Sequence, residues 1–170
     1  MGTSRLRVEA RGLIYDASGK PDTEKVAIFT SLCPCADGSL LSCFQVASAK
    51  RAPDARLQLC RSVDGGNTWA EQSWRFATTV TGIPVSLAAG EVVEVQPGRL
   101  LLLATWFDRS EPKRPLFDPA SEGVLHSKIL KSFSTDGGQT WSAWEEVDVG
   151  GLRGCAGTGP IVKWPDGARS

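Results

Sequence analysis

The chemistry-bearing side chains with the most regular spacing belong to an eight-residue pattern, S-x-D-x-G-x-T-W, that occurs twice. Its fixed positions are Ser62, Asp64, Gly66, Thr68 and Trp69 in the first copy, and Ser134, Asp136, Gly138, Thr140 and Trp141 in the second. A serine hydroxyl and a carboxylate two residues apart can accept hydrogen bonds from nearby backbone N–H groups, and glycine allows the positive φ angles of a tight turn. The two aspartates are therefore predicted to hold turns and to take no part in catalysis.

Thiol and metal chemistry have weaker support. The cysteines are odd in number and do not form a disulfide framework: they are Cys33, Cys35, Cys43, Cys60 and Cys155. Cys33 and Cys35 would face the same side of a strand, but C-x-C lacks partner ligands and His126 is the only histidine. We therefore expect reduced thiols, which slightly favour a reducing compartment, and no metal or other cofactor.

Each copy of the pattern needs two β-strands to position it, and the surrounding sequence predicts them. Alternating or apolar runs predict strands at 5–15, 26–33, 39–47, 56–61 and 71–77, and then at 91–95, 100–107, 125–133 and 142–149. The same order of strand, glycine turn, strand, loop, strand and S-x-D-x-G-x-T-W turn occurs twice. The second unit carries a longer loop at 108–123, and no long stretch shows helical periodicity.

Four-stranded units repeated along a chain are the signature of an all-β propeller. We therefore interpret residues 1–170 as a partial propeller, with a first blade at 26–77, a second at 91–149 and the start of a third at 159–170. The S-x-D-x-G-x-T-W pattern is that of the Asp-box, or bacterial neuraminidase repeat, and the chain resembles the sialidase superfamily. The resemblance implies a six-bladed ring, of which an N-terminal fragment of about two and a half blades is present. Residues 5–15 would then be the closing outer strand of the last blade.

The resemblance also implies a substrate mouth at the end of the blades away from the Asp boxes. Asp54, in the loop before the third strand of the first blade, is the nearest match to the aspartic acid/base of these enzymes. The candidate substrate-binding positions near the mouth are Lys50, Arg51, Trp106, Asp108, Arg109 and Arg153. Each has an ordinary alternative: Asp54 as a turn former, the loop charges as solvated groups, and Trp106 as blade packing.

Sialidases bind the sugar carboxylate with arginines, whose guanidinium fork matches a carboxylate, and they use a tyrosine nucleophile with a glutamate. The first arginine belongs to an Arg-Ile-Pro motif, and the aligned stretch here is Ile28-Phe29-Thr30-Ser31-Leu32, without the arginine. Tyr15 is the only tyrosine and lies on the predicted closing strand. Two functions stay open: an exo-α-sialidase-like glycoside hydrolase acting on glycans, and a non-catalytic propeller that binds glycan or protein partners.

The composition limits the classes of binding partner that the sequence indicates. The apolar fraction of 41% and the charged fraction of 22% are those of an ordinary globular protein. The formal net charge of zero provides no basic footprint for nucleic acid or an acidic membrane surface, and no apolar run approaches a membrane span. The first residues lack the apolar core of a signal peptide and so do not indicate export; the location stays open, with the cytoplasm slightly favoured. The oligomeric state stays open.

Overall fold

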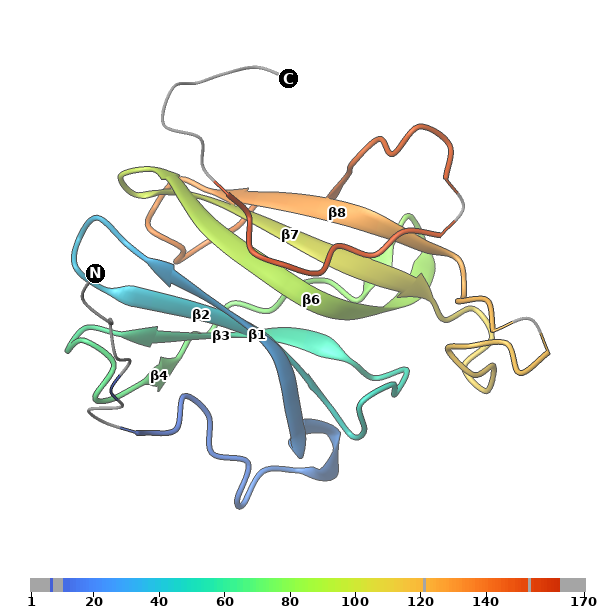
Figure 1. Cartoon of the computed structure of the whole chain (residues 1–170), viewed down its shortest axis with the longest axis horizontal. Helices are drawn as coiled ribbons and strands as arrows, with labels where there is room; N and C mark the ends of the chain where they lie inside the picture. Colours follow the sequence, from blue (N-terminus) through green and yellow to red (C-terminus); the bar gives the residue numbers. More distant parts are fainter. Residues whose placement is uncertain (1–6, 8–10, 121, 153, 163–170) are drawn as a thin grey trace, which may run out of the picture.

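The computed structural model describes residues 7, 11–120, 122–152 and 154–162, and it folds them into two antiparallel sheets that pack against each other (Figure 1). The first sheet has the order β1-β2-β3-β4 and the second β5-β6-β7-β8-β9. The strands are β1 Val26–Pro34, β2 Leu40–Ala47, β3 Arg56–Ser62, β4 Ala70–Glu71, β5 Thr79–Val80, β6 Ile83–Gln96, β7 Arg99–Asp108, β8 Ser127–Ser134 and β9 Glu145–Glu146. A short 3₁₀ helix, η1 Asp22–Glu24, precedes β1.

The core lies between the two sheets and follows from strand alternation. Successive side chains of a strand point to opposite faces, so every second residue can reach the neighbouring sheet. The buried residues of this core include Leu41, Cys43, Leu57 and Leu59 from the first sheet and Leu87, Leu100, Leu102, Trp106 and Leu130 from the second. Strand β6 packs against β1, β2 and β3, which fixes the position of the second sheet on the first.

A smaller cluster covers the other face of the first sheet. Phe44, Val46 and Cys60 are buried there, and Ile14 and Tyr15 pack over them. A strand was predicted at 5–15, but residues 11–15 pair with no strand, and of the remainder only residue 7 is described. Side-chain packing, rather than a backbone ladder, holds Ile14 and Tyr15 on the sheet.

The outer strands are shorter than predicted. The expected strands at 71–77 and 142–149 are two-residue strands, β4 and β9. Beyond β4 the chain leaves the sheet edge because its aromatic side chains turn into the gap between the sheets. There Phe76 stacks on Trp144 with ring centroids 5.0 Å apart and also contacts Trp141. The second unit therefore uses its outer segment to pack on the first.

The inner strand of the second sheet is longer than predicted. β6 begins at Ile83, whereas the apolar run indicated a start at 91. Its first half has Pro84 at its start and an Ala-Ala-Gly stretch in its middle, residue types that weaken a strand pattern. Despite this, Val85 and Leu87 are buried in the core between the sheets, and β5, which was not predicted, pairs with the beginning of β6.

The segment predicted to open a third blade is described only as far as 162, and residues 163–170 lie outside the described part. Residues 159–162 belong to no strand. The preceding segment lies along the second sheet, where the backbone N–H of Gly157 donates to Thr105 Oγ1 at 3.0 Å and that of Cys155 to Ser127 Oγ at 3.0 Å (Figure 1, red).

Candidate functional site

The inner strands of the two sheets carry the same irregularity. In β1, Phe29 and Thr30 form a bulge, and in β6 Ala89 and Gly90 form the equivalent one. The first residue of each bulge has a left-handed backbone, with φ of 56° at Phe29 and 49° at Ala89. Such a conformation is unusual for a residue other than glycine, and bulges are frequent beside active sites. Ser31 Oγ donates to Gly90 O at 2.7 Å and so ties the two bulges together.

A cavity of about 280 Å³ lies against these bulges. Its lining is Phe29, Gln45, Lys50, Arg51, Ala52, Ala55, Ser86, Ala88, Ala89, Thr105, Phe107, Arg109, Leu116, Phe117, Ala156 and Thr158. The walls are mainly apolar, with three aromatic rings, and the long loop after β7 supplies Leu116 and Phe117. Of the lining residues that the structure describes, three are cationic and none is an aspartate or a glutamate. The cavity is therefore electrostatically suited to an anion.

Arg109 is the buried cation of this cavity, with 4% of its surface exposed. Its Nε donates to Ser86 Oγ at 2.8 Å and its Nη2 donates to the carbonyl of Arg51 at 3.2 Å. Burial lowers the pKa of the guanidinium, but an arginine stays protonated at neutral pH. Among the described residues no carboxylate forms an ion pair with it.

Lys50 and Arg51 are exposed at the rim of the cavity, each with its charged group over an aromatic ring. Lys50 Nζ lies 6.0 Å from the centroid of Phe29, and Arg51 Cζ lies 4.5 Å from the centroid of Phe117. Cation–π contacts of this kind contribute about 0.5–1 kcal/mol at exposed sites. The loop backbone at Lys50 is held by a hydrogen bond, which Gln45 Nε2 of β2 donates to Lys50 O at 3.2 Å.

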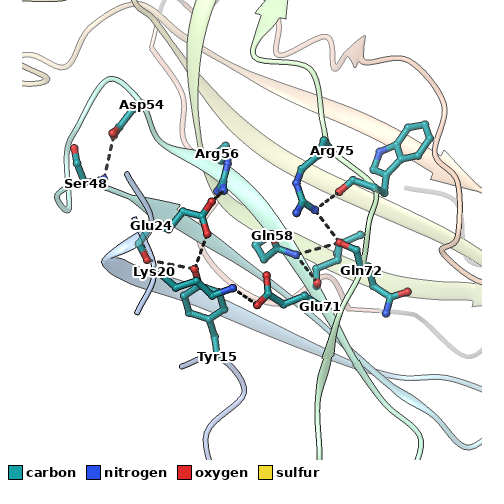
Figure 2. Close-up of polar contacts among 12 residues, drawn as sticks. Tyr15, Lys20, Glu24, Ser48, Asp54, Arg56, Gln58, Glu71, Gln72 and Arg75 are labelled. Carbon is teal, nitrogen blue, oxygen red and sulfur yellow. Dashed lines mark hydrogen bonds and ion pairs between the residues drawn. The ribbon is translucent and has the colours of Figure 1, made fainter. Parts of the chain in front are cut away.

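Two predicted site residues lie outside the cavity lining. Asp54 is exposed, and its Oδ1 accepts a hydrogen bond from the backbone N–H of Ser48 at 3.2 Å, which closes the 48–54 loop (Figure 2). Asp108 accepts hydrogen bonds from the hydroxyl and backbone N–H of Ser110 at 2.7 and 2.8 Å, and these lower its pKa. In this arrangement each carboxylate is engaged within its own loop.

Trp106 also lies outside the lining because of its position in the strand alternation. It is 2% exposed and belongs to the core between the sheets, where its ring contacts that of His126 with centroids 5.5 Å apart. Thr105, Phe107 and Arg109 instead reach the cavity. Sequence reasoning missed Phe107 and Phe117, although the two-residue period of β7 would have indicated Phe107. Arg153 lies outside the described residues.

Tyr15 and Glu24 have the residue types of a sialidase nucleophile and its activating base, but the pair lies outside the cavity. Tyr15 Oη donates to Glu24 Oε2 at 3.1 Å, and the same carboxylate pairs with Arg56 (Figure 2). Burial, with a further contribution from the Glu24 hydrogen bond, raises the pKa of Tyr15 to about 12. A nucleophile needs the opposite shift, and neither residue lines the cavity. The pair fastens the N-terminal segment to the first sheet.

In the two S-x-D-x-G-x-T-W turns, the serine, aspartate and threonine side chains form hydrogen bonds within the turn itself. In the first, Ser62 Oγ accepts from the Gly66 N–H at 2.9 Å and donates to Asp64 at 2.7 Å, and Thr68 Oγ1 donates to the same carboxylate at 2.6 Å. In the second turn the corresponding distances are 2.8, 2.8 and 2.5 Å. The threonine hydrogen bonds are the main reason that the pKa of Asp64 and of Asp136 falls to about 2.

The cysteines are free thiols, and burial raises the pKa of Cys33 and Cys60 to about 11. Within the described ranges, no group of three or more His, Cys, Asp or Glu residues could hold a metal ion. No helix in the part of the chain that the structure describes has the length and apolar character needed to span a membrane.

The fold and its turns define a class: two consecutive antiparallel sheets with inner strands side by side and Asp-box turns are blades of a β-propeller of the sialidase type. Over 112 residues the chain is 34% identical to a sialidase of Micromonospora viridifaciens, a match that covers 62% of this chain and 17% of that protein. The resemblance indicated by the Asp boxes is thereby confirmed. No protein-family model matches the chain.

A solved sialidase structure supports the fold. Hadza microbial sialidase Hz136 superposes with a TM-score of 0.56 and 20% identity, over 74% of this chain and 26% of that one. An α-L-arabinanase of Penicillium chrysogenum, solved with arabinobiose, gives a TM-score of 0.48 and 21% identity, over 72% of this chain and 33% of that one. The chain thus spans a small part of the length of the relatives that it matches, and it has a glycoside hydrolase-like fold.

Proposed function

We propose that the chain forms part of the substrate mouth of a sialidase-like glycoside hydrolase, and that the cavity at the two bulges receives an anionic sugar. The observation that carries this proposal is the charge of the cavity: Lys50, Arg51 and Arg109 line it, and no acidic side chain among the described residues does. A guanidinium binds a carboxylate strongly in a site that excludes water. Sialic acid, the sugar released by sialidases, carries such a carboxylate.

The non-catalytic alternative has an observation of its own. Asp54, the candidate acid/base, lies outside the cavity and is engaged with the backbone of Ser48. The stretch Ile28-Phe29-Thr30-Ser31-Leu32, where the resemblance places the Arg-Ile-Pro motif, has no arginine. A propeller that binds the anionic sugar of a glycan without cleaving it would need the cationic cavity and no acid.

Two measurements separate these functions. Binding of N-acetylneuraminate and of its methyl ester is measured by calorimetry, and the free acid is expected to bind at least about 10-fold more tightly because the ester lacks the charge. Hydrolysis is measured with a fluorogenic sialoside, on the wild type and on Asp54→Asn. Release of the fluorophore that Asp54→Asn slows supports the hydrolase with Asp54 as acid/base, whereas binding without release supports the alternative. Equal affinity for acid and ester, or none for either, would overturn both.

A further inference from the structure

We propose that Arg109 is the anchor of this cavity for a ligand carboxylate. This inference deepens the proposed function and rests on it for the identity of the sugar. The binding of a carboxylate by Arg109 follows independently, from the burial and hydrogen bonds of the guanidinium. Arg109 directly follows the end of β7, in the second sheet. Its position therefore differs from that of the stretch 28–32 on β1, where the resemblance places the first arginine, although Phe29 of that stretch lines the same cavity.

The argument starts from the cost of a buried charge. An ionised side chain removed from water is strongly disfavoured unless an opposite charge or several hydrogen bonds compensate it. Arg109 is 96% buried, and among the described residues its only hydrogen-bond acceptors are Ser86 Oγ and the Arg51 carbonyl, both neutral. Compensation for the charge by the described residues is therefore incomplete, and a bound anion would complete it.

The donor geometry favours a carboxylate. A guanidinium has five N–H donors in one plane, and two of those of Arg109 are used, at Nε and Nη2. These two bonds fix the plane, one to β6 through Ser86 and the other to the 50–51 loop. Three N–H donors remain, on Nη1 and Nη2, and adjacent donors on these two atoms match the two oxygens of a carboxylate. Such a preorganised fork loses little entropy when the ligand binds.

The other two cations of the cavity fit a secondary role. Lys50 and Arg51 are exposed, and their charged groups lie over Phe29 and Phe117. Exposed charges are screened by water and salt, so they attract an anion to the mouth without holding it in one geometry. Arg109, buried and fixed, is the cation able to set the position of the carboxylate.

The test uses Arg109→Gln, Arg109→Lys and, as a matched loss of one positive charge away from the cavity, Lys113→Gln. Acetate and N-acetylneuraminate are titrated into the ¹⁵N-labelled chain while the Arg109 Nε–H resonance is followed by NMR. Wild type and Lys113→Gln are expected to show saturable shifts with both carboxylates and none with the neutral methyl ester. Arg109→Gln is expected to lose about 10- to 100-fold in affinity for the acids, and Arg109→Lys an intermediate amount because lysine lacks the fork.

The outcomes separate this inference from the proposed function. If acetate shifts the Arg109 resonance but N-acetylneuraminate does not bind, the anchor stands and the sialidase-like function fails. If N-acetylneuraminate binds but neither carboxylate moves that resonance, and Arg109→Gln keeps its preference for acid over ester, the anchor is overturned and the proposed function stands. If no carboxylate affects Arg109, the anchor is overturned as well. Near-ultraviolet circular dichroism confirms that each variant is folded, and the wild-type resonance decides the matter should Arg109→Gln unfold.

Discussion

The two blades are nearly identical at one end and different at the other. At the Asp-box end, the hydrogen bonds of the serine and threonine side chains in the first turn recur in the second within about a tenth of an ångström. At the mouth, the bulges in β1 and β6 share their backbone geometry, but the left-handed residue is Phe29 in one and Ala89 in the other. A turn whose side chains bond to each other fixes those side chains, whereas a bulge fixes only the backbone.

This difference shows where the repeat leaves room for function. An Asp box that lost its serine or aspartate would leave its own N–H groups without acceptors, so each copy keeps the same residues. A bulge imposes no such demand, and its side chain is free to serve a ligand. The cavity with its three cations lies at the bulges, which is the end where the two units differ.

The largest expected effect comes from the Asp-box glycines and shows that the two boxes differ in packing. Gly138 has φ of +89°, and a β-carbon there would lie 3.1–3.3 Å from Arg61, Leu41 and Leu100 of both sheets. Gly66, with φ of +94°, would meet Leu40 only at 3.5 Å. Gly138→Ala should lower the free energy of unfolding by about 2–4 kcal/mol and Gly66→Ala by about 1–2 kcal/mol, because both are strained and only the first is also overpacked. Equal losses in urea denaturation would contradict this difference.

The second position of each bulge offers the next comparison. A β-carbon on Gly90 would approach Cys43 Sγ to 2.5 Å and Leu57 to 3.0 Å, whereas Thr30, its counterpart, is exposed and already carries one. Gly90→Ala should destabilise the chain by about 1–3 kcal/mol through overpacking between the sheets. Thr30→Ala is the matched control, and a change of less than about 0.5 kcal/mol is expected for it. A similar loss in both variants would mean that the bulges are not packed differently.

The sequence predicted the parts of this molecule that local chemistry determines. The Asp-box turns and the six strands β1, β2, β3, β6, β7 and β8 follow from glycine, aspartate and apolar alternation, although the start of β6 was missed. The outer strands were overestimated because Phe76 and Trp144 pair across the two sheets, a tertiary contact that no local pattern contains.

The cavity was predictable only in part. Loop position indicated Lys50, Arg51 and Arg109, and the structure brings these three together. It leaves Asp54, Asp108 and Trp106 outside the cavity lining. The two aspartates form hydrogen bonds within their own loops, and Trp106 lies on the face of β7 that points into the core. Whether Arg109 is exposed or buried depends on Ser86 and on the 50–51 loop, which are distant in sequence. Burial of a loop arginine could therefore not be seen from the chain alone.

A smaller effect is expected when the left-handed residues are replaced by glycine. A left-handed backbone costs about 1–2 kcal/mol at a residue other than glycine, and both Phe29→Gly and Ala89→Gly remove this cost. Glycine also gives the unfolded chain more conformational freedom, which lowers the free energy of unfolding by about 0.5–1 kcal/mol in each variant. Ala89→Gly should therefore gain up to about 1 kcal/mol of unfolding free energy, and Phe29→Gly should gain less because it also loses the contact of the ring with Lys50. Only Phe29→Gly should also weaken ligand binding, by about 3- to 10-fold, because the ring forms one wall of the cavity. Unchanged affinity in Phe29→Gly would assign the ring no role in binding.

The mildest effect expected is the response of the Asp boxes to acid. The pKa of Asp64 and of Asp136 is about 2 in the folded chain and near the ordinary value of about 4 in the unfolded one. Above pH 4 both carboxylates are ionised in both states, and the boxes contribute their full stability. As pH falls from 4 to 2 the unfolded chain takes up protons first, so the free energy of unfolding decreases across that window.

The size of this decrease is limited because both carboxylates are exposed to solvent, which screens their charge. Urea denaturation at pH 5, 4 and 3 should show the decrease, and Asp64→Asn with Asp136→Asn should reduce its slope. Some slope remains, since hydrogen bonds to Ser18, Ser39 and Ser110 also lower the pKa of Asp16, Asp37 and Asp108. An unchanged slope in the double variant would show that the boxes are held by their glycines and tryptophans and not by their carboxylates.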